Sequence, residues 1–138
     1  MLDRVWWHDP QKLIYSQFSG TISLQDLKQM IELASSMMET EGSEIGVDLI
    51  IDVSRFERYD RDFMNLGAVR ALTQVHPKTR WIIVIDPLPN PIARFVGLTT
   101  IKLLRLRYAI AKSEPEAMAF IQHITPIPSY DSIKPPEL

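Results

Sequence analysis

The sequence predicts a single α/β domain built on a mostly parallel sheet, because strand-like and helix-like segments alternate along most of its length. Two strand-like segments open the chain and are separated by a short turn sequence. Short apolar runs rich in β-branched residues then alternate with amphipathic segments, in the order β-β-α-β-α-β-α-β-α. Right-handed crossovers then give a mixed sheet of about five strands flanked by about four helices, with the opening hairpin as one antiparallel edge.

The first two strands are predicted to form an antiparallel hairpin. Residues 4–8 (RVWWH) are aromatic and strand-like, and residues 13–22 (LIYSQFSGTI) form a second strand. The intervening DPQK places Pro10 at the second position of a turn, which suits its fixed φ angle. A short turn joins two strands in antiparallel orientation. The two faces of the second strand are expected to carry Ile14, Ser16 and Phe18, and Leu13, Tyr15 and Gln17.

The aromatic residues of this hairpin are candidates for a platform. Alternation puts Trp7 with Val5 on one face and Trp6 with His8 on the other, so one tryptophan is expected to point away from the core. Tyr15 joins them from the second strand. Such a tryptophan either packs under a helix or lies at an interface, and the sequence leaves both possibilities open.

The first helix is marked by its cap and by one apolar stripe. Ser23 is a good N-cap, and Asp26 stands three residues later. The methionines of this helix are interpreted as core filler rather than as a ligand-binding site. The positions predicted to face the core are Leu27, Met30, Ile31, Ala34 and Met38.

The second half of the chain repeats strand and helix three times. Residues 47–53 (VDLIIDV) are predicted to be a strand covered on both faces, and a helix is predicted over 62–75. Residues 80–86 form the next strand, and a helix capped by Asn90 begins at Pro91. Residues 107–113 form the last strand. The last helix follows, with Ser113 and Glu116 as its capping box.

The domain is expected to span residues 1–124. Residues 125–138 contain four prolines without periodicity, which predicts a C-terminal tail that drapes over the surface or is disordered. The chain has 138 residues and a net charge of −2, so it lacks the basic footprint of a nucleic-acid-binding protein. It has no cysteine, signal peptide or long apolar run, which predicts a soluble cytoplasmic protein without membrane insertion.

The sequence offers little support for catalysis. Asp52 and Asp86 both end buried strands, where a divalent cation or a phosphoryl group is sometimes held, and Lys112 also follows a strand. The opening hairpin does not fit a phosphate-receiver domain, so structural carboxylates are the preferred interpretation. No histidine pair has metal-ligand spacing, and no serine lies in a nucleophile-elbow sequence. We therefore expect no catalytic residue, no metal and no cofactor.

Three stretches resemble the STAS domain, the fold of the bacterial anti-sigma-factor antagonists, and its SpoIIAA-like relatives. They are FSGTISLQDLKQMIE, DLIIDVSRFERYD and AIAKSEPEAMAFI, and the similarity extends over about residues 4–124. The resemblance implies a protein-binding signalling module. Regulatory members carry an Asp-Ser-Ser-Gly-like segment whose first serine is phosphorylated, and this chain has Asp60, Arg61, Asp62 and Phe63 there. Ser54 belongs to the turn before this segment, and its side chain is expected to form a hydrogen bond with the backbone of that turn.

The third helix is predicted to carry apolar residues on two opposite faces. Leu98 and Ile101 point away from the core side, beside Arg94 and Arg105. Either the tail or a loop covers them, or they meet a second copy or another protein. The corresponding region lies near the partner-binding face of the resembled family.

Together these observations predict a non-enzymatic protein-interaction module that binds a protein partner, itself as a homodimer, or both. The alternative is a small-molecule or lipid-binding domain with a pocket between sheet and helices, and an enzyme comes third. Contact is expected through the loop after Val53, the following helix and the third helix. The candidate partner-binding residues are Ser54, Arg55, Glu57, Arg58, Asp60, Arg61, Asp62, Arg94, Leu98, Ile101 and Arg105.

Overall fold

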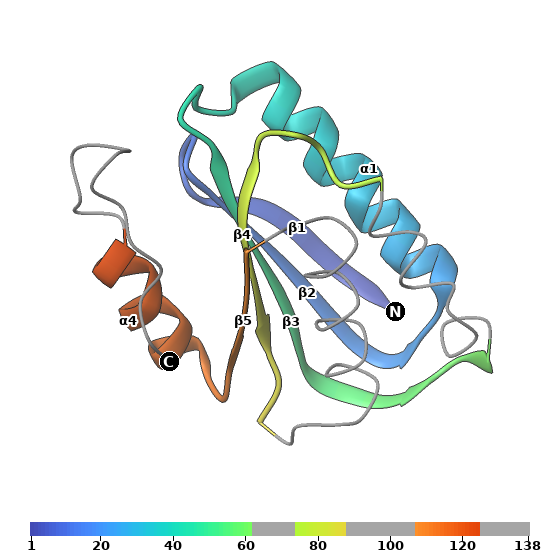
Figure 1. The fold of residues 1–138 in the computed structure, drawn as a ribbon. Helices are drawn as coiled ribbons and strands as arrows, with labels where there is room; N and C mark the ends of the chain where they lie inside the picture. The colour runs from blue at the N-terminus through green and yellow to red at the C-terminus, as the bar shows by residue number, and fades with distance from the viewer. Residues whose placement is uncertain (62–73, 88–106, 125–138) are drawn as a thin grey trace.

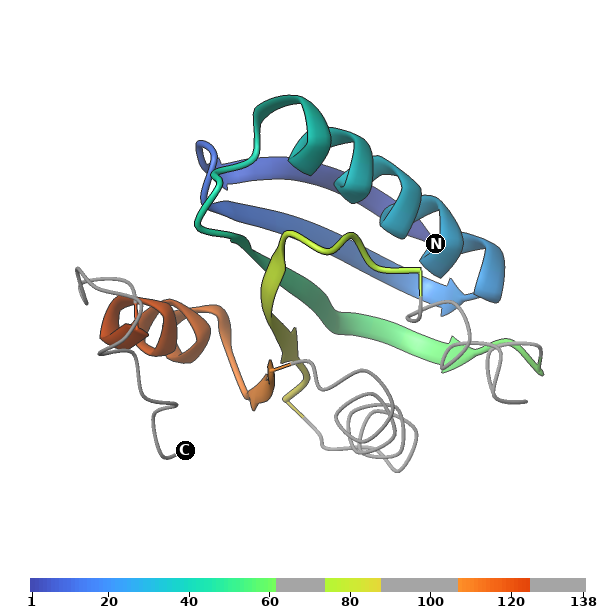
Figure 2. The same cartoon turned by 45° about the horizontal axis from the view of Figure 1, so that its top comes forward.

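A computed structural model describes residues 1–61, 74–87 and 107–124 of the chain (Figure 1). It has a sheet with α1 on one face and α4 on the other (Figures 1 and 2). The strands are β1 (Leu2–Asp9), β2 (Leu13–Ile22), β3 (Val47–Tyr59), β4 (Thr79–Ile85) and β5 (Arg107–Ala111), and the helices are α1 (Leu24–Glu41) and α4 (Glu114–Ile124).

The sheet has five strands in the order β1-β2-β3-β4-β5. β1 runs antiparallel to β2, and the other neighbours are parallel, which confirms the predicted mixed sheet with one antiparallel edge. The described residues contain two helices rather than the four expected. Residues 62–73 of the predicted helix over 62–75 lie outside the described residues. The predicted helix from Pro91 falls on 88–106 and also lies outside them, as does the tail 125–138.

The opening hairpin has the predicted turn and a longer first strand. β1 covers eight residues rather than the five expected. Pro10 follows β1, and the Lys12 amide donates to the Asp9 carbonyl oxygen over 3.1 Å. Gln11 has a φ of 70°, a value that a turn of type II requires at its third position.

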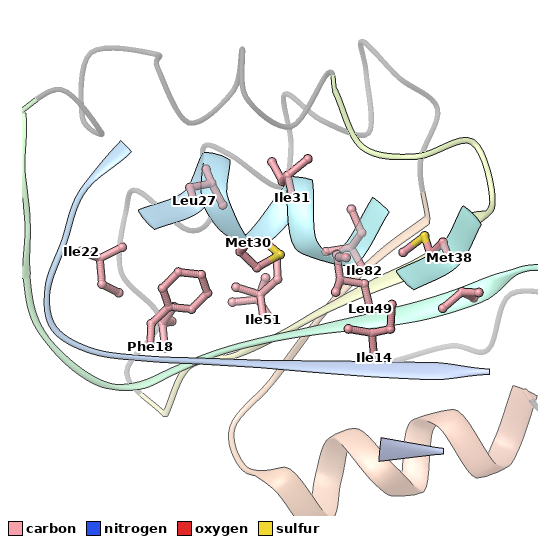
Figure 3. Close-up of a cluster of buried hydrophobic side chains, with 14 residues drawn as sticks. Ile14, Phe18, Ile22, Leu27, Met30, Ile31, Met38, Leu49, Ile51 and Ile82 are labelled. Atoms are coloured by element: carbon pink, nitrogen blue, oxygen red, sulfur yellow. The ribbon is translucent and has the colours of Figure 1, made fainter. Parts of the chain in front are cut away.

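The face of the sheet under α1 carries the larger apolar cluster (Figure 3). Ser23 and Asp26 form the predicted capping box, with the Asp26 amide donating to Ser23 Oγ and the Ser23 amide donating to Asp26 Oδ2. The five helix positions predicted to face the core are all buried. They pack on Ile14, Phe18 and residues of β3 and β4, so the spacing of apolar residues in α1 fixes how it lies on the sheet.

The opposite face of the sheet packs against α4. Trp81 of β4 meets Phe120 of α4 edge to face, with ring centroids 5.0 Å apart. Ser113 caps α4 by accepting from the Glu116 amide, as predicted. The second half of the predicted box differs, because the Glu116 carboxylate accepts from the Lys112 amide.

The two adjacent tryptophans of β1 lie on opposite faces, which confirms the predicted alternation. Trp7 packs against the cluster under α1, and Trp6 packs against the cluster under α4. Both are half-buried, so neither simply points away from the core. No helix in the described ranges is long and apolar enough to cross a lipid bilayer.

Candidate interaction surface at the end of β3

β3 is much longer than its neighbour β4. The pairing of β3 with β4 ends where Asp52 is opposite Ile85. β3 continues to Tyr59, and over this stretch its described partner is β2, from Ser19 opposite Arg55 to Ile22 opposite Tyr59. Figure 2 shows β3 running on beside β2 after β4 has ended. We call residues 53–59 the β3 extension.

The predicted loop after Val53 is therefore wrong. Ser54, Arg55, Glu57 and Arg58 lie within β3 rather than in a turn. The charged residues of this stretch are typical of a loop. The second half of β2 nevertheless pairs with it in parallel and keeps its backbone extended. Pairing with a neighbouring strand outweighs the local composition here.

A β-bulge marks the start of the β3 extension. Gln17 is opposite Asp52, and Ser19 is opposite Arg55. Between these two pairs β3 therefore contains one residue more than β2, which defines a bulge. Inside the bulge, the Ser54 amide donates to Asp52 Oδ1 over 2.9 Å. A local side-chain bond was predicted for Ser54, but Asp52 provides the side chain and Ser54 its backbone.

Tyr15 holds the other carboxylate oxygen of Asp52. The Tyr15 hydroxyl donates to Asp52 Oδ2, and both residues are buried, at 2% and 5% exposure. Beside them, Ser16 Oγ donates to the Ile50 carbonyl oxygen over 2.6 Å. The bulge at the start of the β3 extension is thus held in place by the hydrogen bonds of the buried Asp52. The sequence singled out Asp52 but gave no sign that Tyr15 would be its partner.

Burial of the Tyr15 hydroxyl raises its pKa far above the ordinary value, and the bond to Asp52 and the negative charge of that residue add to the increase. A pKa raised in the folded state means that stability is complete below about pH 10, where unfolded tyrosine titrates, and falls above it.

Tyr15→Phe is expected to lower the free energy of unfolding at neutral pH by about 1.5–3 kcal/mol, because a hydrogen bond to a buried carboxylate is lost. Urea denaturation measures this loss. Above about pH 10 the difference between the variant and the wild type should shrink, since only the wild type loses stability through this hydroxyl. A difference that stays constant up to pH 11 would contradict the raised pKa of Tyr15.

The predicted site residues within the described chain gather at one place. Ser54, Arg55, Glu57, Arg58, Asp60 and Arg61 are all exposed. Arg58 Nε donates to Thr21 Oγ1 over 3.1 Å, and the Asp60 amide donates to the Ile22 carbonyl oxygen over 2.9 Å. The remaining candidates, Asp62, Arg94, Leu98, Ile101 and Arg105, lie outside the described residues.

The two strand-end aspartates are buried. Asp52 is engaged by Tyr15 and Ser54, and the Asp86 amide donates to the Ala111 carbonyl oxygen over 2.9 Å. Within residues 1–61, 74–87 and 107–124, no three histidine, aspartate or glutamate side chains are grouped to hold a metal ion. The contacts of Asp52 match the structural role that the sequence favoured for it.

Aromatic side chains line the α4 face of the hairpin. The rings of Trp6 and Tyr15 stack with centroids 4.6 Å apart, and the Arg4 guanidinium lies 4.5 Å from the Trp6 ring centroid. His8 is tilted against Tyr15 at 5.6 Å. The predicted association of Trp6 with Tyr15 is present, whereas Trp7 faces α1. The stacked rings cover Tyr15 and so help to bury its bond with Asp52.

The sequence matches no family model and no curated protein. Among solved structures, the chain is similar to an uncharacterized protein of the DUF3478 family from Shewanella loihica PV-4, which is described as having a SpoIIAA-like fold. The TM-score is 0.55 at 10% identity, and the match covers 87% of this chain and 90% of that chain. At this identity the likeness concerns the fold alone, and it agrees with the resemblance seen in the sequence. The chain has a SpoIIAA-like fold.

Proposed function

We propose that this chain is a non-enzymatic regulatory module that binds another protein, or itself, through the β3 extension and the residues that follow it. The observation that carries the proposal is the row of exposed charged side chains on a paired, anchored strand. Arg55, Glu57 and Arg58 stand on β3, whose bulge is fixed by the buried Tyr15–Asp52 bond. Because the backbone of the extension is already ordered, binding a partner costs little further backbone entropy.

Mixed charge on this surface favours recognition of a protein. Arginine and glutamate alternate along the extension, and Asp60 and Arg61 continue the pattern. Such a pattern selects a partner with complementary charges and speeds its association more than it raises affinity. A strongly basic surface would instead favour nucleic acid, and the net charge of −2 does not support that class of partner.

Regulation by phosphorylation of the usual serine does not fit the sequence. The segment that aligns with the phosphoacceptor reads Asp60, Arg61, Asp62 and Phe63, and none of these residues carries a side-chain hydroxyl. We therefore propose that binding through this surface does not depend on phosphorylation of that segment. Leu98 and Ile101, with Arg94 and Arg105 beside them, are proposed as a second part of the same binding surface.

A small-molecule or lipid pocket is less well supported. In the described part of the chain, the buried side chains between α1 and the sheet are at most 8% exposed. Those between α4 and the sheet are also at most 8% exposed. The described interior therefore gives no specific reason to prefer a ligand-binding function.

Charge reversal on the β3 extension tests the proposed function. Arg58→Glu/Arg61→Glu should reduce capture of a cross-linked partner protein from the native cells by about tenfold or more, since each 1.4 kcal/mol is a factor of ten. Lys12→Glu/Lys28→Glu is the matched control, because it makes the same change in net charge at two exposed positions away from the extension. Quantitative mass spectrometry of the captured proteins measures the difference.

The result against the proposal would be equal capture by the two variants, or cross-links that never involve the extension. Leu98→Asp/Ile101→Asp tests the second part of the surface in the same assay. It should weaken capture while leaving the circular dichroism spectrum and the unfolding midpoint of the chain unchanged.

A further inference from the structure

We propose that an extended acidic segment of a partner protein binds along β2, with its carboxylates held by Arg4 of β1 and by Arg55 and Arg58 of β3. This inference rests on the proposed function, because it uses the β3 extension, and it names the chemistry of the partner. It follows from the position of three exposed arginines on one face of three neighbouring strands.

The floor of the proposed site is a row of polar side chains on β2. Phe18 and Ile22 belong to the cluster under α1. Alternation therefore puts Gln17, Ser19 and Thr21 on the opposite face of the sheet, and we call these three residues the polar row. Gln17 and Ser19 are half-buried, and Thr21 is exposed. Alternate residues of a strand are about 6.6–6.8 Å apart, so the polar row is regularly spaced.

Each residue of the polar row has an arginine opposite it on a neighbouring strand. The pairs are Gln17 with Arg4 of β1, Ser19 with Arg55 of β3, and Thr21 with Arg58 of β3. Directly opposite residues direct their side chains to the same face of a sheet, and all three arginines are exposed. The arginines therefore lie on both sides of the polar row and follow its spacing along β2.

The β-bulges at this place belong to the neighbours of β2. Asp3 is the extra residue of β1, and β3 has one extra residue between Asp52 and Arg55 and a second at Glu57. In each case the extra residue is on the neighbouring strand, so β2 sets the spacing of the arginines. Arg58 comes three residues after Arg55, and only the bulge at Glu57 returns it to the same face.

Uncharged groups hold two of the arginines in place. The guanidinium of Arg4 lies 4.5 Å from the centroid of the Trp6 ring, which itself stacks on Tyr15. Arg58 Nε donates to Thr21 Oγ1 over 3.1 Å. These contacts restrict both side chains without neutralising their charge. Less conformational entropy is therefore lost when they bind a carboxylate.

The charge of the site is opposite to that of the chain. Asp3 lies beside the polar row, where its Oδ1 accepts from Ser19 Oγ over 2.8 Å. Within residues 3–4 and 55–58, three arginines outnumber the two acidic residues Asp3 and Glu57. The site is therefore positive on a chain whose net charge is −2, which favours an acidic ligand.

An extended peptide with an acidic residue at every second position matches the spacing of the arginines. Its alternate side chains lie on one face, about 6.6–6.8 Å apart. Arginine binds a carboxylate through two parallel hydrogen bonds, so it recognises the shape of the group as well as its charge. The site should therefore prefer alternating glutamates to the same glutamates in another order.

Two blocked peptides of equal composition test this preference, namely Glu-Ser-Glu-Ser-Glu and Glu-Glu-Glu-Ser-Ser. The alternating peptide should bind the full chain about threefold more tightly, because all three of its carboxylates lie on one face when it is extended. Titrations followed by the backbone amide NMR signals measure both dissociation constants. The signals of Ser19, Thr21 and Arg55 should shift most.

Substitutions of the arginines test the residues. Arg4→Gln/Arg58→Gln should weaken binding of the alternating peptide by about tenfold, and Arg4→Lys/Arg58→Lys, which keeps the charge, by about threefold. Lys12→Gln/Lys28→Gln is the matched control, because it removes the same charge at two exposed positions elsewhere. The control should change the dissociation constant by less than about twofold.

The outcomes separate this inference from the proposed function. Equal affinity for the two peptides, equal effects of the glutamine variants, or equally tight binding of inorganic phosphate would overturn the acidic-segment site. If neither peptide binds while capture of a partner still depends on Arg58 and Arg61, this inference falls and the proposed function stands. If the alternating peptide binds as expected but charge reversal leaves capture unchanged, the acidic-segment site stands and the proposed function falls.

Discussion

Replacing Arg80 with methionine should lower the free energy of unfolding by about 3–5 kcal/mol, because it leaves the carboxylate of Asp48 buried without its cation. Asp48 is 3% exposed, and the side chain of Arg80 is 15% exposed. Arg80 Nε and Nη2 bind the two carboxylate oxygens over 3.0 and 2.8 Å. Such a two-point contact binds β3 to β4, and urea denaturation of the variant measures its loss.

Two further proteins show whether the buried charge is responsible. Asp48→Leu/Arg80→Met removes both charges and should regain most of the lost stability, since a buried ion pair is often replaceable by apolar side chains. Arg58→Met makes the same change at an exposed arginine and should alter the free energy of unfolding by about 0.5 kcal/mol or less. A loss below about 1 kcal/mol for Arg80→Met would mean that Asp48 is hydrated after the substitution.

Phe18→Ala should cost about 3–5 kcal/mol, since it removes a large aromatic side chain and leaves a cavity. Phe18 is 1% exposed and belongs to the cluster between α1 and the sheet, near Ile22 and Met30 (Figure 3). The cluster is formed by elements with fixed backbones, so it can collapse only partly into the space. Thermal and urea denaturation both measure the change.

Conservative and surface substitutions calibrate this value. Phe18→Leu retains much of the apolar volume and should cost clearly less than Phe18→Ala. Leu33→Ala removes an apolar side chain that is 44% exposed on α1 and should change stability by about 0.5 kcal/mol or less. Equal losses for Phe18→Ala and Leu33→Ala would contradict the position of Phe18 in the core.

The helix α1 shows what the sequence determines by itself. Its N-cap, its capping box and all five of its buried positions are predicted, because each depends on residues within a few places of one another. The faces of β2 are predicted for the same reason, since alternation is a local property of a strand. The parallel pairing of the later strands is predicted from the alternation of strands and helices, and the antiparallel edge from the short turn of the hairpin.

The end of β3 shows what the sequence alone misses. Ser54 and Arg55 are typical of a turn, and only the length of β2 on the neighbouring side makes them part of a strand. The Tyr15–Asp52 bond depends on the register between β2 and β3, in which Tyr15 lies opposite Ile50. The Asp48–Arg80 pair depends in the same way on an irregularity between β3 and β4. A contact that depends on the register between two strands cannot be predicted from the sequence of either strand alone.

The sequence predicts which charged residues are exposed better than it predicts the secondary structure on which they lie. The sequence selects Arg55, Glu57 and Arg58, and the structure describes them as exposed. It places them on a loop, whereas they stand on β3, where β2 pairs with it. This difference changes the expected contact surface from a flexible loop that adapts to a partner into a strand whose backbone is held by β2.

The two faces of the sheet become complete at different times during synthesis of the chain. Among the described residues, 14 are buried between α1 and the sheet; twelve of them precede residue 60, and Ile82 and Val84 come later. On the α4 side, all but Leu13, Tyr15 and Ile50 come from Trp81 onward. A chain emerging from the ribosome can therefore assemble β1, β2, α1 and β3 as a compact intermediate before β4 and α4 are made. Until then the side of that intermediate with Leu13, Tyr15 and Ile50 lacks the described partners from β4, β5 and α4 that bury it in the finished fold.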